Sequence, residues 1–325
     1  MKKPAIILLL FVFAGQISMA QTFVATGTVS DQGVPLRYAF VYDKQSKNAT
    51  YTDSLGEFKL PVNQGAQLTI TCKGYVETTL SASDKSAMNI ILKKDMTPAG
   101  QAVSNEDEKM VEDAFKSVHD DLGKPGVTPF SQATFTTVKE TRGSQFLFSE
   151  WAHGYIVDAK GNIVQAPTLL LNYNKMTGDL FMTEDRNSVI TADKNHIRSF
   201  VLFGPQDQQY TFEMMPGISA DHFCQVLSAG NKYKIYKLTI TKFVPSNYHT
   251  DGVVSTGNLY DEYADNSSYY ISNLTTTAFQ PLNLNKKSIK LAFAAEGNKI
   301  DDFLATHKIK ENDAWVKALG DAMNQ

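Results

Sequence analysis

The sequence has few cysteines, no long apolar run after its first residues and none of the common catalytic motifs. Two cysteines in 325 residues are too few for a disulfide scaffold. The G-x-S-x-G, S-x-x-K, H-E-x-x-H, G-x-x-x-x-G-K-S/T and G-x-G-x-x-G patterns of hydrolases, zinc proteases and nucleotide-binding enzymes are missing. Acidic residues (34) outnumber basic residues (31), so the strongly basic face that nucleic acid requires is not expected. The sequence therefore predicts a protein that is not an enzyme, uses no cofactor or metal and binds no nucleic acid.

The first twenty residues have the features of a cleaved signal peptide. Two lysines precede the apolar run 6–14, and Ser18 and Ala20 supply the small residues that a signal peptidase reads. The apolar run is shorter than the about 20 residues of a transmembrane helix, although an uncleaved anchor is the alternative. We expect residues 1–20 to be removed before Gln21, leaving an exported protein with no permanent membrane span. No cysteine follows the cleavage point, so no lipid anchor is expected.

The two cysteines, Cys72 and Cys224, can pair in an oxidising compartment. Leu68, Ile70 and Cys72 alternate along one predicted strand and therefore share a face. This phase favours a buried, unpaired thiol at Cys72, and a disulfide to Cys224 is the alternative.

Short β-type runs separated by turn residues fill the region 23–94. They predict seven strands, over residues 24–29, 36–42, 48–52, 57–60, 67–72, 77–80 and 88–92. In the turn 53–56, we expect the aspartate to bond its own turn backbone and Gly56 to close the turn. Seven short strands with closely spaced turns are typical of an all-β sandwich.

One set of residues in this region carries a family resemblance. The pattern is Gly27-x-Val29-x-Asp31-x-Gly33-x-Pro35-Leu36-x-x-Ala39-x-Val41, then Thr52-Asp53-x-x-Gly56-x-Phe58 and Lys73-Gly74-Tyr75. On these residues the region resembles the carboxypeptidase regulatory-like domain, a transthyretin-like β-sandwich common in exported proteins of Gram-negative bacteria. The resemblance implies an accessory module for folding, attachment or partner contact, without catalytic residues or peptidase activity. It also implies a periplasmic or outer-membrane-associated location.

The composition divides the mature chain into two domains, which suits its length. The β-sandwich takes residues 21–95, and a polar linker with Pro98 and Gly100 takes residues 96–104. An α+β domain follows over residues 105–325. It opens with a predicted amphipathic helix, 105–122.

The larger domain returns to β patterning and ends in helices. Predicted strands are 133–140, 145–157, 168–174, 178–183, 188–193, 199–203, 209–214, 223–229, 233–244 and 268–272. Predicted helices are 288–295, 298–306 and 312–323, the last capped by Asn312 with Trp315 and Ala318 on its inner face. The spacing suggests one large antiparallel sheet, curled or closed into a shell and covered at an edge or open face by the helices. The predicted fold is mainly β in two domains.

The strand 233–244 has two phases of apolar residues. Tyr236, Leu238 and Ile240 alternate in one phase, while Tyr233 and Ile235 have the other. A β-bulge near Tyr236 would reconcile the two phases.

Aromatic residues are dense beyond the linker, and most suit packing in strands. Tyr248, Tyr260 and Tyr263 fall in the loop-rich stretch 245–267 instead. Loops carry binding residues more often than strands do. These three tyrosines are therefore the predicted ligand-binding residues.

Two further groups have simpler interpretations. His222 and Cys224 share a face if their segment is a strand, as nucleophilic catalysis would need, but packing of the thiol inside the sheet is the simpler reading. The acidic residues of the stretch 245–267 offer oxygen ligands for calcium, but their spacing matches no calcium loop. These residues are Asp251, Asp261, Glu262 and Asp265.

We therefore expect an exported, non-enzymatic binding or structural protein of a Gram-negative cell envelope. Its β-sandwich would mediate contact with another envelope protein, and its specificity would lie beyond the linker. One alternative is a small-ligand carrier with an apolar pocket in the C-terminal sheet. Another is a hydrolase that uses His222 and Cys224.

Overall fold

The computed structural model describes residues 22–84, 86–96, 123–124, 141–186, 188–250, 254–274 and 278–325. The predicted signal peptide (1–20), helix 105–122 and strand 133–140 lie outside these described residues, as does the linker after residue 96. The chain divides into two compact units, with the boundary between Lys94 and Asp95. Strands dominate both units and helices follow at the C-terminus, so the predicted mainly-β class is confirmed.

The first unit is a sandwich of two four-stranded sheets. Its strands are β1 (Thr22–Asp31), β2 (Val34–Pro35), β3 (Phe40–Asp43), β4 (Asn48–Tyr51), β5 (Glu57–Asn63), β6 (Gln67–Thr71), β7 (Thr78–Ser81) and β8 (Met88–Ile91). One sheet has the order β2-β1-β5 with β8 parallel to β1, and the other has the order β4-β3-β6-β7. The short β2 is an eighth strand beyond the seven predicted. Alternate apolar residues of both sheets form one shared core.

Residues that carry the family resemblance stabilise turns of this sandwich and contacts between its distant segments. Asp53 Oδ1 accepts hydrogen bonds from the backbone N–H groups two and four residues later (2.9 and 2.8 Å), as predicted. Gly56 has a φ of 73°, which favours glycine. The carboxylate of Asp31 accepts a hydrogen bond from the Tyr75 hydroxyl (3.1 Å) and pairs with Lys94 (3.2 Å). These residues therefore serve the scaffold.

The second unit is built on one sheet of twelve strands, all paired antiparallel. Its order is β22-β21-β18-β17-β16-β15-β10-β12-β13-β14-β9, and β11 pairs with β10. The strands are β9 (Gly123–Lys124), β10 (Ala152–Asp158), β11 (Ile163–Val164), β12 (Leu170–Asn174), β13 (Asp179–Thr183), β14 (Ile190–Ala192), β15 (Ile197–Phe203), β16 (Gln209–Met214), β17 (Phe223–Ala229), β18 (Tyr233–Val244), β21 (Glu262–Asn273) and β22 (Ala278–Pro281). In the described part of the chain β22 and β9 do not pair, so the sheet is open rather than closed.

An aromatic cluster fills the space beside β12, β15, β16 and β17. The rings of Tyr173, Phe200, Phe212 and Phe223 pack with centroids 4.9–6.2 Å apart. The Tyr173 hydroxyl accepts a hydrogen bond from the backbone N–H of Phe223 (3.1 Å), which satisfies this buried polar group. This part of the sheet therefore has a side-chain-filled interior.

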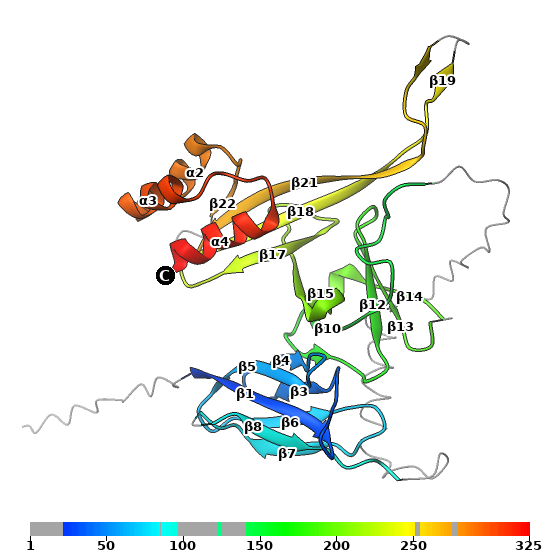
Figure 1. Ribbon diagram of the computed structural model, residues 1–325, viewed down its shortest axis with the longest axis vertical. Helices are drawn as coiled ribbons and strands as arrows, with labels where there is room; N and C mark the ends of the chain where they lie inside the picture. The colour runs from blue at the N-terminus through cyan, green and yellow to red at the C-terminus, as the bar shows by residue number, and fades with distance from the viewer. Residues whose placement is uncertain are drawn as a thin grey trace, which may run out of the picture. The chain divides into compact units, whose positions relative to one another are not determined.

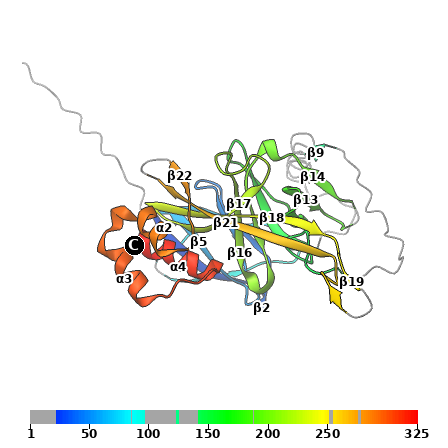
Figure 2. The same ribbon diagram turned by 90° about the horizontal axis from the view of Figure 1, so that it is seen from above.

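Helices α2 (Lys286–Ala292), α3 (Asn298–Thr306) and α4 (Asp313–Asn324) gather at one end of β18 and β21 (Figure 1, Figure 2). The Asn312 side chain caps α4 by accepting a hydrogen bond from the Trp315 N–H (2.9 Å), as predicted. Ala318, predicted to face inward, is exposed, because Val316 and Gly320 face the sheet instead. Among the described residues, no helix has the length and apolar character needed to cross a membrane.

The two apolar phases of β18 belong to its two faces, and both faces are covered from Tyr233 to Leu238. Tyr233 and Ile235 pack under the helices, whereas Tyr236 and Leu238 pack on the opposite face with Cys224. The register with β21 is unbroken, so the predicted bulge is not in β18. A register shift occurs instead in β17, opposite Tyr236 and Ile235.

Both thiols are free, so the alternative disulfide is not formed. Cys224 is fully buried, while Cys72 is only half-buried.

Candidate functional site

Strands β18 and β21 form a ribbon and are the longest strands among the described residues of the second unit. The two strands of 12 residues pair from Tyr233↔Asn273 to Val244↔Glu262. The ribbon continues into a small hairpin, β19 (His249–Thr250) and β20 (Ser255–Thr256). This hairpin lies at the opposite end from helices α2–α4 in both views (Figure 1, Figure 2). We call residues 242–250 and 254–262 the outer ribbon.

The predicted loop 245–267 is wrong in its last part, because β21 already begins at Glu262. Tyr263 is therefore a strand residue. The segment that follows it contains Asp265, Asn266, Ser267 and Ser268, residue types that are depleted in strands. Pairing with β18 imposes the strand here against the local preference.

Arg142 holds the base of the outer ribbon. Its backbone N–H donates to the Asp261 carbonyl (2.9 Å), and its own carbonyl accepts from the Tyr263 N–H (2.8 Å). Its guanidinium carbon lies 4.0 Å from the centroid of the Tyr260 ring, a cation–π contact. The Tyr263 ring packs against Phe243 with centroids 5.2 Å apart. Two of the three predicted binding tyrosines are thus held in defined positions.

The third, Tyr248, lies nearer the tip and is 42% exposed. Its hydroxyl donates a hydrogen bond to the Ser255 Oγ across the tip hairpin (2.9 Å). Within the described residues, no hydrogen bond or ring contact joins Tyr248 to Tyr260 or Tyr263. The structure therefore places the three tyrosines on one ribbon without bringing them into mutual contact, and ligand binding by them stays a prediction.

The outer ribbon exposes large apolar side chains. We call them the outer ribbon surface, and they are Phe243 (47% exposed), Val244, Tyr248, Val254 (58%) and Leu259 (47%). Phe243 and Val244 are adjacent in β18 and therefore face opposite sides of the ribbon, so exposed apolar side chains lie on both of its sides. Large exposed apolar surface is a feature of interaction sites.

A lysine anchors the ribbon to the turn after β12. Lys175 Nζ lies 2.6 and 2.9 Å from the two carboxylate oxygens of Asp265, and the Thr241 hydroxyl donates to the same carboxylate. The Lys175 side chain is 11% exposed and that of Asp265 is 44% exposed. Partial burial acts to raise the pKa of Asp265, but the hydrogen bonds from Lys175 and Thr241 and the lysine charge outweigh it and hold this pKa below its usual value.

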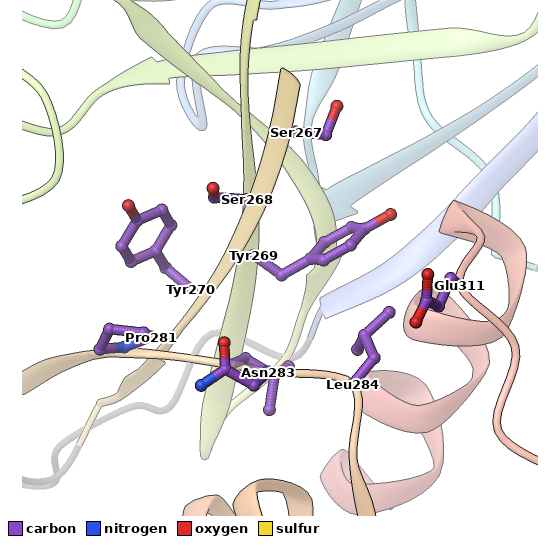
Figure 3. A pocket seen from close by; sticks show the side chains of 9 residues that line it. Ser267, Ser268, Tyr269, Tyr270, Pro281, Asn283, Leu284 and Glu311 are labelled. Carbon is purple, nitrogen blue, oxygen red and sulfur yellow. The ribbon is translucent and has the colours of Figure 1, made fainter. Parts of the chain in front are cut away.

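A notch of about 430 Å³ opens at the edge of β21, next to the end of β22. It is lined by Ser267, Ser268, Tyr269, Tyr270, Pro281, Leu282, Asn283, Leu284 and Glu311. Figure 3 shows Tyr269 and Tyr270 projecting to opposite sides of β21, with Glu311 on the Tyr269 side. The notch therefore straddles the edge of the sheet rather than entering its core.

An ionic network supports the Tyr269 side of the notch. The Tyr269 hydroxyl donates to Asp313 Oδ1 (2.9 Å), and Lys237 Nζ lies 2.7 Å from Asp313 Oδ2. Burial, the hydrogen bond to Asp313 and the charges of Asp313 and Glu311 raise the pKa of Tyr269 well above its usual value. The hydroxyl is thus a fixed hydrogen-bond donor at neutral pH. Sequence reasoning missed the notch because its residues come from three separated segments.

The alternative in which His222 and Cys224 form a nucleophilic pair has no support, and the thiol is packed inside the sheet as the simpler interpretation expected. Cys224 packs against Tyr236 and Leu238, and burial, with the nearby charge of Glu213, raises the pKa of its thiol to about 12. His222 Nε2 instead lies 3.4 Å from the carbonyl oxygen of Met176. A reactive thiolate is therefore not available at neutral pH.

The acidic residues near the ribbon are spread over separate contacts. Asp261 accepts a hydrogen bond from the Ser246 N–H (2.6 Å), and Asp265 pairs with Lys175. Asp251 lies outside the described residues. In the part of the chain that the structure describes, no group of three His, Cys, Asp or Glu side chains is placed to hold a metal ion.

Comparisons with protein-family models, with curated proteins and with solved structures gave no match. The resemblance of residues 23–94 to the carboxypeptidase regulatory-like domain therefore stays a prediction.

Proposed function

We propose that this chain is an exported, non-enzymatic binding or structural protein of a Gram-negative cell envelope. The observation that carries the proposal is the outer ribbon surface, where large apolar side chains stay exposed on an antiparallel ribbon. Such surfaces serve contact with another protein or with a membrane. The proposed partner is another protein of the envelope.

The construction of the ribbon supports this role. Lys175 fixes its middle, and Arg142 fixes the base of its outer half through two backbone hydrogen bonds and the Tyr260 ring. A binding surface that is already held in place loses less conformational entropy on association. The outer ribbon is therefore preorganised for a partner.

The first unit supports an accessory role for this domain. The residues of its family pattern stabilise turns, as at Asp53, and contacts between distant segments, as at Asp31. The resemblance implies attachment or partner contact for such a module. The buried Cys224 weighs against the hydrolase alternative.

The carrier alternative has weaker support. The notch has the volume of a small-ligand site, but it lies open at a strand edge and its lining includes two serines, an asparagine and a glutamate. The aromatic cluster around Tyr173 fills the space where a carrier would need its apolar pocket.

Site-directed photocrosslinking in cells tests the proposal. A photoreactive amino acid at Leu259, on the outer ribbon, should give a covalent adduct with a defined envelope protein. The same amino acid at Leu291, which is 72% exposed on α2, is the matched control and should give none. Equal adducts from both positions, or robust hydrolysis of peptides or glycans by the purified mature protein, would contradict the proposal.

A further inference from the structure

Among the described residues, the edge of β21 away from β18 is free over a short stretch. β22 pairs only with residues 270–273 of β21, and Arg142 bonds only at Asp261 and Tyr263. In the described part of the chain, nothing pairs with the outer edge of Ala264–Ser268, and residues 265–268 are exposed. Tyr263 and Tyr269 both bond away from β18, so the odd-numbered residues between them, Asp265 and Ser267, also point their N–H and C=O groups outward.

This free edge is a template for one more strand. Unpaired N–H and C=O groups in a row pair readily with an added chain, and proteins usually block such edges with lysine, proline or a covering element. Residues 264–268 contain no lysine or proline, and their one charged side chain, Asp265, is paired with Lys175. The notch lies beside them. An added strand would thus find backbone partners at Asp265 and Ser267 and a recess for a side chain beside Tyr269.

The length of the gap decides which occupant fits. The free stretch of five residues measures about 17 Å, at about 3.4 Å per residue. Arg142 closes one end, and the Leu282 N–H bonded to the Tyr269 carbonyl (2.8 Å) closes the other. The 12-residue β21 of a second copy is too long for this gap, whereas a short extended segment fits.

The charge at the notch decides the chemistry of that segment. Glu311 is the ionic residue among the nine that line the notch, and it forms no ion pair within the described residues. Asp313, close by, is already neutralised by Lys237. A basic side chain in the notch would therefore meet an unpaired carboxylate.

We propose that the free edge of β21 and its notch bind a short extended segment of a partner protein, with a Lys or Arg side chain beside Glu311. Extended peptides bind other proteins in this way, by main-chain hydrogen bonds for affinity and side-chain pockets for specificity. The inference deepens the proposed function, on which it rests because its occupant is a protein.

Selection from a random pentapeptide display library against the purified mature protein tests the proposal. Enriched peptides should carry one Lys or Arg at a constant position. N-methylation of one set of alternate residues in an enriched peptide should weaken binding at least tenfold, because these N–H groups pair with β21. Methylation of the other set should have little effect.

Three variants assign the binding to this edge. Ser267→Pro should weaken peptide binding at least tenfold, since it removes an outward N–H and blocks the edge. Ser267→Ala keeps the backbone and should bind like the wild type, and Glu311→Gln should weaken binding severalfold. The N–H of Ser267 takes no part in the β18 pairing, so the proline variant should keep the wild-type tryptophan fluorescence.

Other outcomes would overturn the inference. It fails if no peptide is enriched, or if enriched peptides bind Ser267→Pro as tightly as the wild type. It also fails if the mature protein dimerises and Ser267→Pro makes it monomeric, because the occupant is then a second copy. Since crosslinking at Leu259 reports on the outer ribbon alone, failure at the β21 edge leaves that test of the proposed function standing.

Discussion

Replacing Asp265 should show how much the ribbon depends on its buried lysine. Asp265→Asn keeps the side-chain shape but leaves the Lys175 ammonium, 11% exposed, without its counter-charge. Breaking a buried ion pair costs about 3–5 kcal/mol and an exposed pair at most about 1 kcal/mol. Because the Asp265 side chain is 44% exposed, we expect an intermediate loss of about 1–3 kcal/mol in the free energy of unfolding.

Urea unfolding followed by tryptophan fluorescence measures this loss. Both tryptophans of the chain, Trp151 and Trp315, lie in the second unit, so the signal reports on that unit. With an m-value of about 3 kcal/mol/M, the urea midpoint should fall by about 0.3–1 M. The double variant Asp265→Asn, Lys175→Met should recover part of the stability, because it removes the unpaired charge.

A matched control is Asp301→Asn, which breaks the exposed pair of Asp301 with Lys290 on α2. It should change the free energy of unfolding by at most about 1 kcal/mol. The reasoning is refuted if Asp265→Asn costs no more than this control. It is also refuted if adding Lys175→Met to Asp265→Asn restores no stability.

The same pair predicts a pH dependence. The pKa of Asp265 is lower in the folded protein than in the unfolded chain, so its contribution to stability is present above the unfolded value of about 3.9. This contribution is lost as the pH falls through the folded value. The stability difference between wild type and Asp265→Asn should therefore be full at pH 7 and shrink below about pH 4.

Two further predictions concern the packing of the second unit. Gly320→Ala should destabilise the protein by about 1–2 kcal/mol, although alanine favours helices, because the added Cβ would lie 2.5 Å from the Ser228 Cβ. Urea unfolding that shows a gain in stability would contradict this packing of α4 on β17. In a Cys72→Ser background, iodoacetamide should modify Cys224 only after denaturation, because this buried thiol has a pKa of about 12. Fast alkylation under native conditions would contradict this prediction and support the hypothesis that Cys224 acts as a nucleophile.

The positions of strands and helices could be predicted from the sequence wherever the local residue pattern favours the same structure as the tertiary environment. Strands β16, β17 and β18 begin and end at the predicted residues. The Asn312 cap and the Asp53 turn were predicted because each is a local hydrogen-bond arrangement within a few residues.

Predictions were wrong where distant segments decide the outcome. The first half of β21 reads as a loop, since its Asp, Asn and Ser residues are poor strand formers, but β18 pairs with it along its whole length. The two phases of β18 suggested a bulge, whereas in the first half of this strand both faces are buried under different neighbours. Trp315, Leu319 and Met323 are buried as the spacing predicts, but Ala318 is exposed, because Gly320, which approaches β17 closely, lies on the inner face of α4 instead.

The sequence by itself determined the mainly-β class, the turn and cap chemistry and the aromatic residues of the ribbon, because these depend on neighbours along the chain. Only the tertiary structure decided that, within the described part of the chain, β21 keeps a free edge and that a notch opens beside it. The edge is free because β22 pairs with one end of β21 and Arg142 bonds at the other, which leaves the residues between them without a partner strand in the described part of the chain. The notch is lined by residues of separate segments, among them Tyr269, Leu284 and Glu311. No local sequence pattern predicts that these three segments lie together, because their proximity depends on the path of the chain between them.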